Sequence, residues 1–264
     1  MFKKIIALAL AVLMLCVCMS ACGKKEVTVA DIQKSGKLVI ATSPDFPPFE
    51  SLTSDGNVEG IEIEIMELIC ADLGVELVIE QMDFDSVLPG VQTGKFTVGV
   101  SGISVTPARE KNTLFTDPYC LAAQAIVVTK DSPITCKADL EGKAVSVQTG
   151  TTAESFCTEN GYEVKSYAAN ADAQMALVTG KVEAWVIDDL TAAEMVALYN
   201  EENPDAPLVV LSEAMTTEPY AFAFAFGSEE LVSAINEILN GLVADGTVAQ
   251  IFEKYNAPYT APQA

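Results

Sequence analysis

The sequence predicts an α/β protein made of two successive units, each a mostly parallel β-sheet flanked by helices. Two observations carry this prediction. From Lys37 onward, short β-rich runs alternate with amphipathic helical segments, a pattern typical of parallel strands joined by crossover helices. The alternation occurs once between residues 38 and 100 and again between residues 143 and 187. A chain of 264 residues can bury a good core as one large or two smaller domains.

The first unit opens with a strand, and glycines follow its two helices. We expect a strand at residues 38–41, a helix at 62–73, a strand at 76–79, a helix at 84–92 and a strand at 96–100. Gly74 and Gly94 follow the helices, and glycine is common there because it adopts left-handed backbone without strain. Thr106 and Pro107 resemble an N-cap and a first helical residue, so a further helix is expected at that point.

The second unit repeats this order. We expect a strand at residues 143–147, a helix after Gly150, a strand at 163–166, a helix at 171–178 and a strand at 184–187. Thr151 with Glu154 matches a capping box at the start of the first of these helices. The only tryptophan, Trp185, is expected in the core.

Extended runs at residues 124–129 and 221–226 flank the second unit, and helices at 229–242 and 247–255 end the chain. If the two runs lie side by side, the second unit is an insertion into the first, and two connecting strands form a hinge. We therefore expect lobe 1 at residues 37–122 plus 224–258 and lobe 2 at residues 123–223.

Residues 1–21 have the pattern of a signal peptide, with Lys3 and Lys4 before an apolar run too short for a membrane span. The cysteine after Ser20 and Ala21 resembles a bacterial lipobox, which implies that Cys22 is acylated and becomes the mature N-terminus. Plain secretion after cleavage at Ala21 is the alternative. Residues 22–36 are expected to be a polar tether. The sequence thus predicts an extracytoplasmic lipoprotein anchored to the cell membrane.

The chain is strongly acidic, with a net charge of −22 that becomes −24 once residues 1–21 and their two lysines are removed. Such a surface repels nucleic acid and anionic lipid headgroups, so membrane contact is expected through the lipid, helped by Lys24 and Lys25. The absence of histidine and of any CxxC pair argues against a zinc or iron site, and no cofactor is expected.

Four cysteines remain outside the leader and the lipobox, namely Cys70, Cys120, Cys136 and Cys157. Four cysteines allow three pairings, and export permits disulfides. A Cys136–Cys157 disulfide is the preferred pairing, and free buried thiols are the alternative.

A single arginine, Arg109, stands among 15 basic residues that are otherwise lysine. A planar guanidinium offers parallel donors that fit a carboxylate in two-pronged fashion, which a lysine cannot do. Arg109 follows a strand and the small residues Ser101, Gly102 and Ser104, which allow a ligand to approach the backbone. The segment therefore predicts a bound carboxylate, against the simpler interpretation of a surface arginine in a turn.

Six stretches in order resemble the polar amino acid uptake family of solute-binding proteins, the capture components of ABC importers. They are ATSPDFPPFE at 41–50, DFDSVLP at 83–89, SGISVTPAR at 101–109, FTDPY at 115–119, VQTGTTAE at 147–154 and ADG at 244–246. The resemblance implies a two-lobed, periplasmic-binding-protein-like fold of type II. It further implies a monomer that binds a free amino acid and hands it to an ABC permease in the membrane.

The resemblance also implies roles for individual residues. Arg109 would clamp the ligand α-carboxylate, Asp188 would accept the α-ammonium, and Phe46 and Phe84 would sandwich the side chain. Further contacts to the carboxylate would come from Ser101, Gly102, Ser104 and Thr152. The simpler interpretations are that Asp188 only caps the helix that follows it and that both phenylalanines belong to the core.

Some features leave alternatives open. Ser43 stands where family members that read cationic side chains often carry an acid, which argues against a basic amino acid unless Asp45 or Asp85 compensates. The fold can also host enzymes, namely prephenate or arogenate dehydratases, which need a general acid with a raised pKa in the cleft. A ligand sensor for a separate signalling partner is the third possibility.

Overall fold

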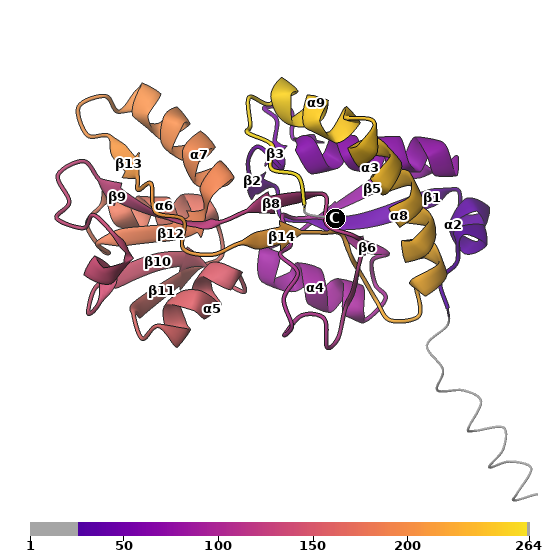
Figure 1. Cartoon of the computed structure of the whole chain (residues 1–264), viewed down its shortest axis with the longest axis horizontal. Helices are drawn as coiled ribbons and strands as arrows, with labels where there is room; N and C mark the ends of the chain where they lie inside the picture. The colour runs from indigo at the N-terminus through magenta and orange to yellow at the C-terminus, as the bar shows by residue number, and fades with distance from the viewer. Residues whose placement is uncertain (1–25, 263–264) are drawn as a thin grey trace, which may run out of the picture.

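The computed structural model describes residues 26–262 and confirms the two-lobed α/β architecture (Figure 1). One five-stranded sheet has the order β5-β1-β6-β15-β7, and the other has the order β11-β10-β12-β9-β13. Each sheet with its helices forms one lobe. The signal peptide, the lipobox and Cys22 lie outside the described residues.

The first sheet is built around β1 (Lys37–Thr42), which pairs in parallel with β5 (Glu76–Gln81) and β6 (Val98–Gly99). On its other side, β15 (Ala223–Phe224) pairs antiparallel with β6 and with β7 (Leu114–Phe115). The helices of this lobe are α2 (Val29–Ser35), α3 (Ile61–Leu73), α4 (Phe84–Gln92), α8 (Glu229–Ala244) and α9 (Thr247–Lys254). A small sheet of β2 (Asp45–Phe46), β3 (Glu50–Leu52) and β4 (Val58–Glu59) adjoins them.

The second sheet repeats the scheme. The strand β10 (Ala144–Gln148) pairs in parallel with β11 (Glu163–Tyr167) and β12 (Ala184–Asp188), whereas β9 (Gln124–Thr129) runs antiparallel to β12 and β13 (Leu208–Val210). Its helices are α5 (Thr152–Glu159), α6 (Asn170–Val178), α7 (Asp189–Glu202) and the short 3-10 helix η1 (Lys137–Leu140).

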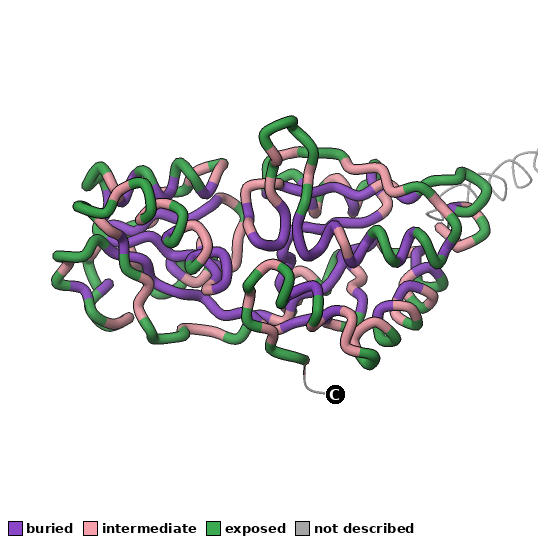
Figure 2. Tube along the Cα trace, turned by 90° about the horizontal axis from the view of Figure 1, so that it is seen from above, coloured by how far each residue is buried: buried purple, intermediate pink, exposed green. Residues whose placement is uncertain are grey.

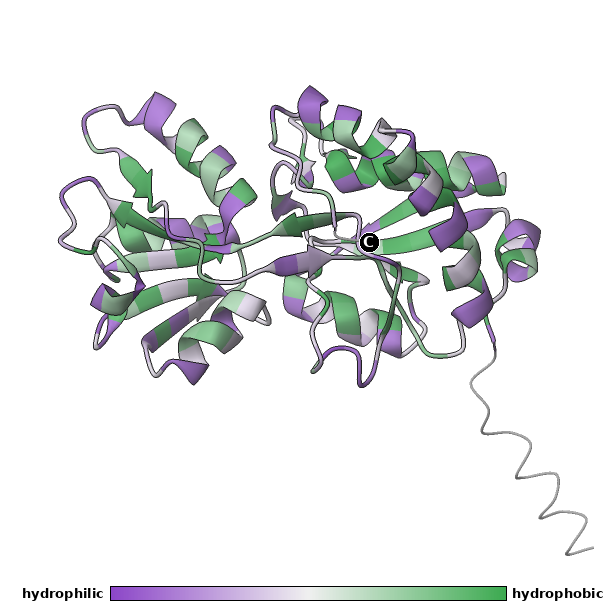
Figure 3. Ribbon diagram, viewed as in Figure 1, coloured by the Kyte–Doolittle hydropathy of each residue, from purple (hydrophilic) through white to green (hydrophobic). Residues whose placement is uncertain are grey.

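Most predicted elements are confirmed, because their signals are local. Helix α3 ends at Gly74, which has a φ of 72° and donates to the last carbonyls of the helix. Apolar residues gather along the strands inside each lobe (Figure 3), and these strands are the most deeply buried parts of the chain (Figure 2). Trp185 is fully buried on β12, as expected for a core residue.

The hinge strands differ from the expected ones. The runs 124–129 and 221–226 do not pair, because β9 is buried in the second sheet and β15 belongs to the first. The strands that run together between the lobes are β8 (Cys120–Ala122) and β14 (Glu218–Tyr220), which pair antiparallel just before those runs (Figure 1). The two segments that connect the lobes are therefore adjacent, as predicted, but each lies just before the predicted run in the sequence.

The N-terminal segment also differs from expectation. Residues 29–35, expected within a polar tether, form helix α2, which Thr28 and Asp31 close with a reciprocal capping box. Ile32 of this helix is buried, and the backbone N–H of Val29 donates to Glu230 on α8 at 3.0 Å. The bond to Glu230 and the buried Ile32 attach this segment to the first lobe. None of the helices in residues 26–262 is long and apolar enough to span a bilayer.

The preferred Cys136–Cys157 disulfide is absent, and all four cysteines of the described chain are free thiols. Cys157 is buried on α5 in the apolar core of the second lobe. Cys136 instead precedes η1, where its sulfur lies 3.6 Å from Asp139. The alternative of free buried thiols therefore holds for Cys70, Cys120 and Cys157, whereas Cys136 is free but only partly buried.

Candidate functional site

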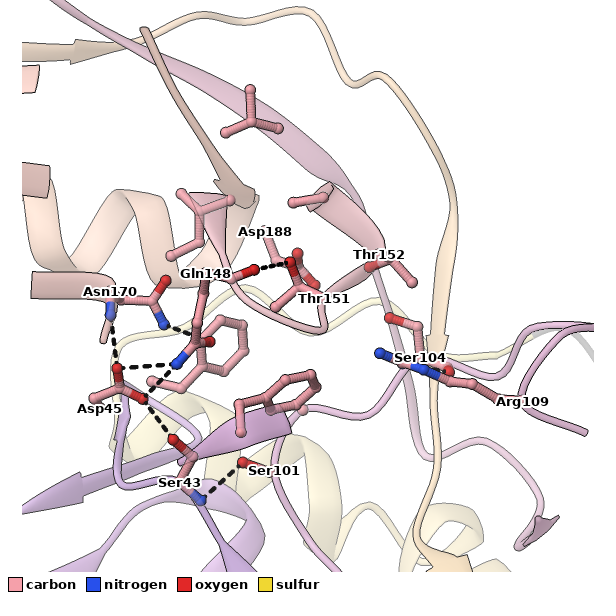
Figure 4. Close-up of a pocket in the computed structure, with 16 residues that line it drawn as sticks. Ser43, Asp45, Ser101, Ser104, Arg109, Gln148, Thr151, Thr152, Asn170 and Asp188 are labelled. Atoms are coloured by element: carbon pink, nitrogen blue, oxygen red, sulfur yellow. Dashed lines mark hydrogen bonds between the residues drawn. The ribbon is translucent and has the colours of Figure 1, made fainter. Parts of the chain in front are cut away.

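A narrow pocket lies between the two lobes and has residues of both in its wall (Figure 4). All eight residues predicted to contact the ligand line it. They are Phe46, Phe84, Ser101, Gly102, Ser104 and Arg109 from the first lobe, and Thr152 and Asp188 from the second. Apart from Phe46 on β2, they come from segments that end or follow strands or begin helices, the edge at which α/β sheets form their ligand crevices.

Arg109 lies on a turn rather than on the predicted helix. Residues 107–112 form turns only, because the chain must reach β7 at Leu114. Thr106 still acts as expected of a cap, since its hydroxyl accepts the backbone N–H of Arg109 at 3.2 Å. The turn thus fixes the backbone of Arg109 at the mouth of the pocket.

The guanidinium of Arg109 bridges the lobes. Nη1 donates to the carbonyl of Ser104 at 2.9 Å, and Nη2 donates across the cleft to the carbonyl of Gly150 at 3.2 Å. The group also lies 5.6 Å from the centroid of the Phe84 ring, a cation–π distance. A guanidinium has five N–H donors, so these two bonds orient it and leave others for a carboxylate.

The N-terminus of α5 faces the same pocket from the second lobe. The Thr151 hydroxyl accepts the backbone N–H of Glu154 at 3.2 Å, as predicted, but the Glu154 carboxylate accepts from Gly150 at 2.7 Å rather than from Thr151. Thr152 and Ala153 occupy the first two helical positions and line the pocket. Backbone N–H groups at these positions have no partner within the helix, and such groups favour an anion.

Asp188 ends β12 in the inner wall of the pocket and is 6% exposed. Its side chain makes no capping bond to α7; Asp189 accepts the N–H of Leu190 at 2.9 Å instead, so the capping interpretation of Asp188 does not hold. The Asp188 carboxylate accepts hydrogen bonds from the Tyr220 hydroxyl and from Gln124 Nε2.

The environment of Asp188 changes its acidity. Burial, followed by the nearby charge of Glu218, raises the pKa of Asp188 to about 7, against the opposing effect of its two hydrogen bonds. Burial lowers the pKa of Arg109, while Asp188 and Glu218 favour its charged form. The pocket therefore contains the guanidinium of Arg109 and the carboxyl group of Asp188. A bound ammonium group would favour the ionised form of that carboxyl group.

The opposite end of the pocket is polar, and sequence reasoning largely missed it. The Asp45 carboxylate accepts from Ser43 Oγ at 3.0 Å, from Gln148 Nε2 at 3.1 Å and from the backbone N–H of Asn170 at 2.7 Å. Asn170 Nδ2 donates in turn to Gln148 Oε1 at 3.0 Å. Asp45 thus reaches across the cleft and caps α6, whose own N-cap residue, Ala169, has no side chain that could do so.

Ser101 and Gly102 line the pocket, but the donors assigned to them are occupied. The Ser101 hydroxyl donates to Glu50 at 2.8 Å, and the N–H of Gly102 donates to Glu62 at 2.8 Å. Gly102 has a φ of 52°, and a Cβ atom there would lie 2.5 Å from the Phe46 ring. These two residues therefore shape the wall, and neither of these donors is free for a carboxylate.

No group of three or more His, Cys, Asp or Glu side chains in residues 26–262 has the arrangement of a metal site.

Comparisons with known proteins show what the chain is similar to. The L-cystine-binding protein TcyJ of Escherichia coli K12 is 27% identical over 228 residues, covering 85% of this chain and 84% of that protein. The P235GK mutant of ArgBP from T. maritima has a TM-score of 0.80 at 36% identity, covering 87% and 99% of the two chains. AncCDT-1, described as an ancestral amino acid-binding protein and a precursor of cyclohexadienyl dehydratase, has a TM-score of 0.78 at 33% identity, covering 86% and 98%.

A family model matches residues 38–258, which span both lobes and every residue that lines the pocket. The chain belongs to the bacterial extracellular solute-binding proteins, family 3.

Proposed function

We propose that the interlobe pocket binds a free amino acid by its two charged ends. The α-carboxylate would lie between Arg109 and the N-terminus of α5, and the α-ammonium would lie at Asp188. The observation that carries this proposal is that one guanidinium and one buried carboxyl, supplied by opposite lobes, face the same pocket. A zwitterion satisfies both, and it would hold Asp188 ionised because an opposite charge nearby favours the charged form.

The ligand side chain would extend past Phe46 and Phe84 toward Asp45. Burial raises the pKa of Asp45, while hydrogen bonds from Asn170, Ser43 and Gln148 oppose the rise. The pocket wall contains two carboxyl groups, those of Asp45 and Asp188, and a single basic side chain, that of Arg109. This balance supports a ligand that brings net positive charge. Asp45 would accept the cationic side chain, because Ser43 has no acidic group that could do so.

We further propose that the protein delivers its ligand to an ABC permease, as an extracytoplasmic receptor attached to the membrane through a lipid on Cys22. The β8–β14 pair supports a hinge between lobe 1, at residues 37–122 plus 224–258, and lobe 2, at residues 123–223. Because Arg109 and Asp188 belong to different lobes, ligand binding would favour the closed form.

A thermal-shift screen of residues 26–264 against the twenty amino acids, ornithine and cystine tests the proposal. A ligand that binds only the folded state raises its melting temperature, and we expect the largest rise with a cationic amino acid. A screen in which no amino acid raises the melting temperature would reject amino acid binding.

The enzyme alternative has one observation in its favour. A dehydratase on this fold needs a carboxylic acid in the cleft that is protonated near neutral pH, and the raised pKa of Asp188, about 7, meets that requirement. Incubation with prephenate and with arogenate decides between the two functions. We expect no product, and formation of phenylpyruvate or phenylalanine would favour the enzyme.

A further inference from the structure

Two buried glutamates support the pocket wall at Ser101 and Gly102. Glu50 lies on β3 and Glu62 on α3, and both are fully buried. Neither forms an ion pair anywhere in the described part of the chain. An unpaired buried charge is costly, so two adjacent carboxylates at this position require an explanation.

The hydrogen bonds give one. Glu62 accepts at both oxygens, from the Tyr119 hydroxyl at 2.6 Å and from the N–H of Gly102 at 2.8 Å. Glu50 Oε1 accepts from the Ser101 hydroxyl at 2.8 Å, whereas Glu50 Oε2 has no donor although it is buried. Glu50 and Glu62 bind the adjacent residues Ser101 and Gly102, and the charge of Glu62 raises the pKa of Glu50, so the two carboxyl groups lie close together. A proton on the unpartnered Oε2 of Glu50 would let this oxygen donate toward Glu62. Because Glu62 already accepts twice, the proton belongs on Glu50.

The surrounding charges favour the same state. Asp45 on β2 and the neighbouring Tyr119 and Cys120 are the titratable groups that face the pair, and none of them is a cation. Burial and the charge of Glu62 raise the pKa of Glu50 well above its usual range. One shared proton leaves a single negative charge, on Glu62. The Tyr119 hydroxyl, the Gly102 N–H and the proton on Glu50 can all donate to it.

We propose that Glu50 and Glu62 are positioning residues, which share one proton held on Glu50 and thereby fix the pocket wall for the ligand. The inference rests on the amino acid binding proposed for this pocket. The Ser101 hydroxyl connects the pair to the wall, since it donates to Glu50 and accepts the N–H of Ser43 at 3.0 Å. Gly102 connects it to the ring of Phe46 through their close contact.

Loss of the shared proton would place two negative charges side by side in a fully buried site that no cation faces. Their repulsion would separate the carboxylates and release the Ser101 hydroxyl, the Gly102 N–H or both. Ligand affinity would then fall at alkaline pH. Stability follows the same sign, because a carboxyl whose pKa is raised by folding stabilises the protein below its unfolded pKa and loses this effect as the pH rises through its folded pKa.

The variant Glu50→Gln tests the proposal, since its amide can accept from Ser101 and donate to Glu62 without a titratable proton. Glu67→Gln, at an exposed glutamate on the same helix as Glu62, is the matched control. Infrared spectra at about pH 8, where Asp188 is largely ionised, should contain the C=O stretch of a protonated carboxylic acid in the wild type and the control. That band should be missing in Glu50→Gln.

Calorimetric titration with the amino acid from the screen, between about pH 7 and pH 9, then measures the effect on binding. The affinity of the wild type relative to Glu50→Gln should fall as the pH rises, a ratio that cancels deprotonation of the ligand itself. Without ligand, the melting temperature of the wild type should fall with pH relative to that of Glu50→Gln.

The outcomes separate the possible failures. Identical infrared spectra and parallel melting profiles would overturn the shared proton. A missing band combined with a constant affinity ratio would make the pair structural and remove its positioning role. A wild type that binds no amino acid would reject the proposed function and the positioning role together, while the spectra and the melting profiles would still decide where the proton lies.

Discussion

Replacing Arg109 with lysine isolates the shape of the guanidinium from its charge. The arginine donates to the carbonyls of Ser104 and Gly150 and still has N–H groups for a carboxylate. A lysine ammonium is a point charge with three donors, so it cannot keep both carbonyls and also form two parallel bonds to a ligand. We therefore expect Arg109→Lys to lose at least one charge-assisted hydrogen bond to the ligand.

The size of the effect follows from that loss. A hydrogen bond to a charged group contributes about 1.5–3 kcal/mol, and each 1.4 kcal/mol changes a dissociation constant about tenfold. The dissociation constant should therefore rise by about 10- to 150-fold. Arg109 is only partly buried, so the melting temperature of the free protein should change little.

Isothermal titration calorimetry with the amino acid from the screen measures this change. Lys111→Arg, the reverse exchange at an exposed position of the same turn, is the control and should bind like the wild type. An Arg109→Lys variant with unchanged affinity would refute the carboxylate assignment.

Three further predictions concern the two other charged positions. Asp188→Asn should weaken amino acid binding by about 10- to 150-fold and spare the deaminated analogue, and equal losses in calorimetry would argue against an ammonium contact. Wild-type affinity should fall about tenfold per unit as the pH drops below about 7, because protonation of Asp188 removes the charge that the ammonium needs, and titrations from pH 5 to 8 should find no such slope in Asp188→Asn. Asp45→Asn should weaken binding of cationic amino acids about tenfold more than that of neutral ones, and equal weakening would restrict Asp45 to its contact with α6.

Much of the fold could be predicted from the sequence because its signals are local. Strand alternation, the capping of α5 by Thr151 and the glycine that ends α3 depend on a few neighbouring residues. The position of the hinge strands could not be predicted in the same way, because it depends on a long-range pairing. The three-residue strands β8 and β14 are too short to show a period, and their pairing joins residues about a hundred positions apart.

The candidate site shows the same division. A lone arginine after a strand, together with the family resemblance, was enough to select eight residues that do line one pocket. The contact of Asp45 with Asn170 joins two lobes, and nothing near either residue indicates it. The occupied donors of Ser101 and Gly102 depend on Glu50 and Glu62, which precede them by about forty to fifty residues. Such partners become visible only when the chain is folded.

The most direct measurement is a crystal structure of residues 26–264 with the amino acid that raises the melting temperature most. It should show the α-carboxylate within hydrogen-bond distance of the Arg109 guanidinium and the N-terminus of α5, with the α-ammonium at the carboxylate of Asp188. A ligand bound away from this pocket, or held there with neither Arg109 nor Asp188 in contact, would contradict the account.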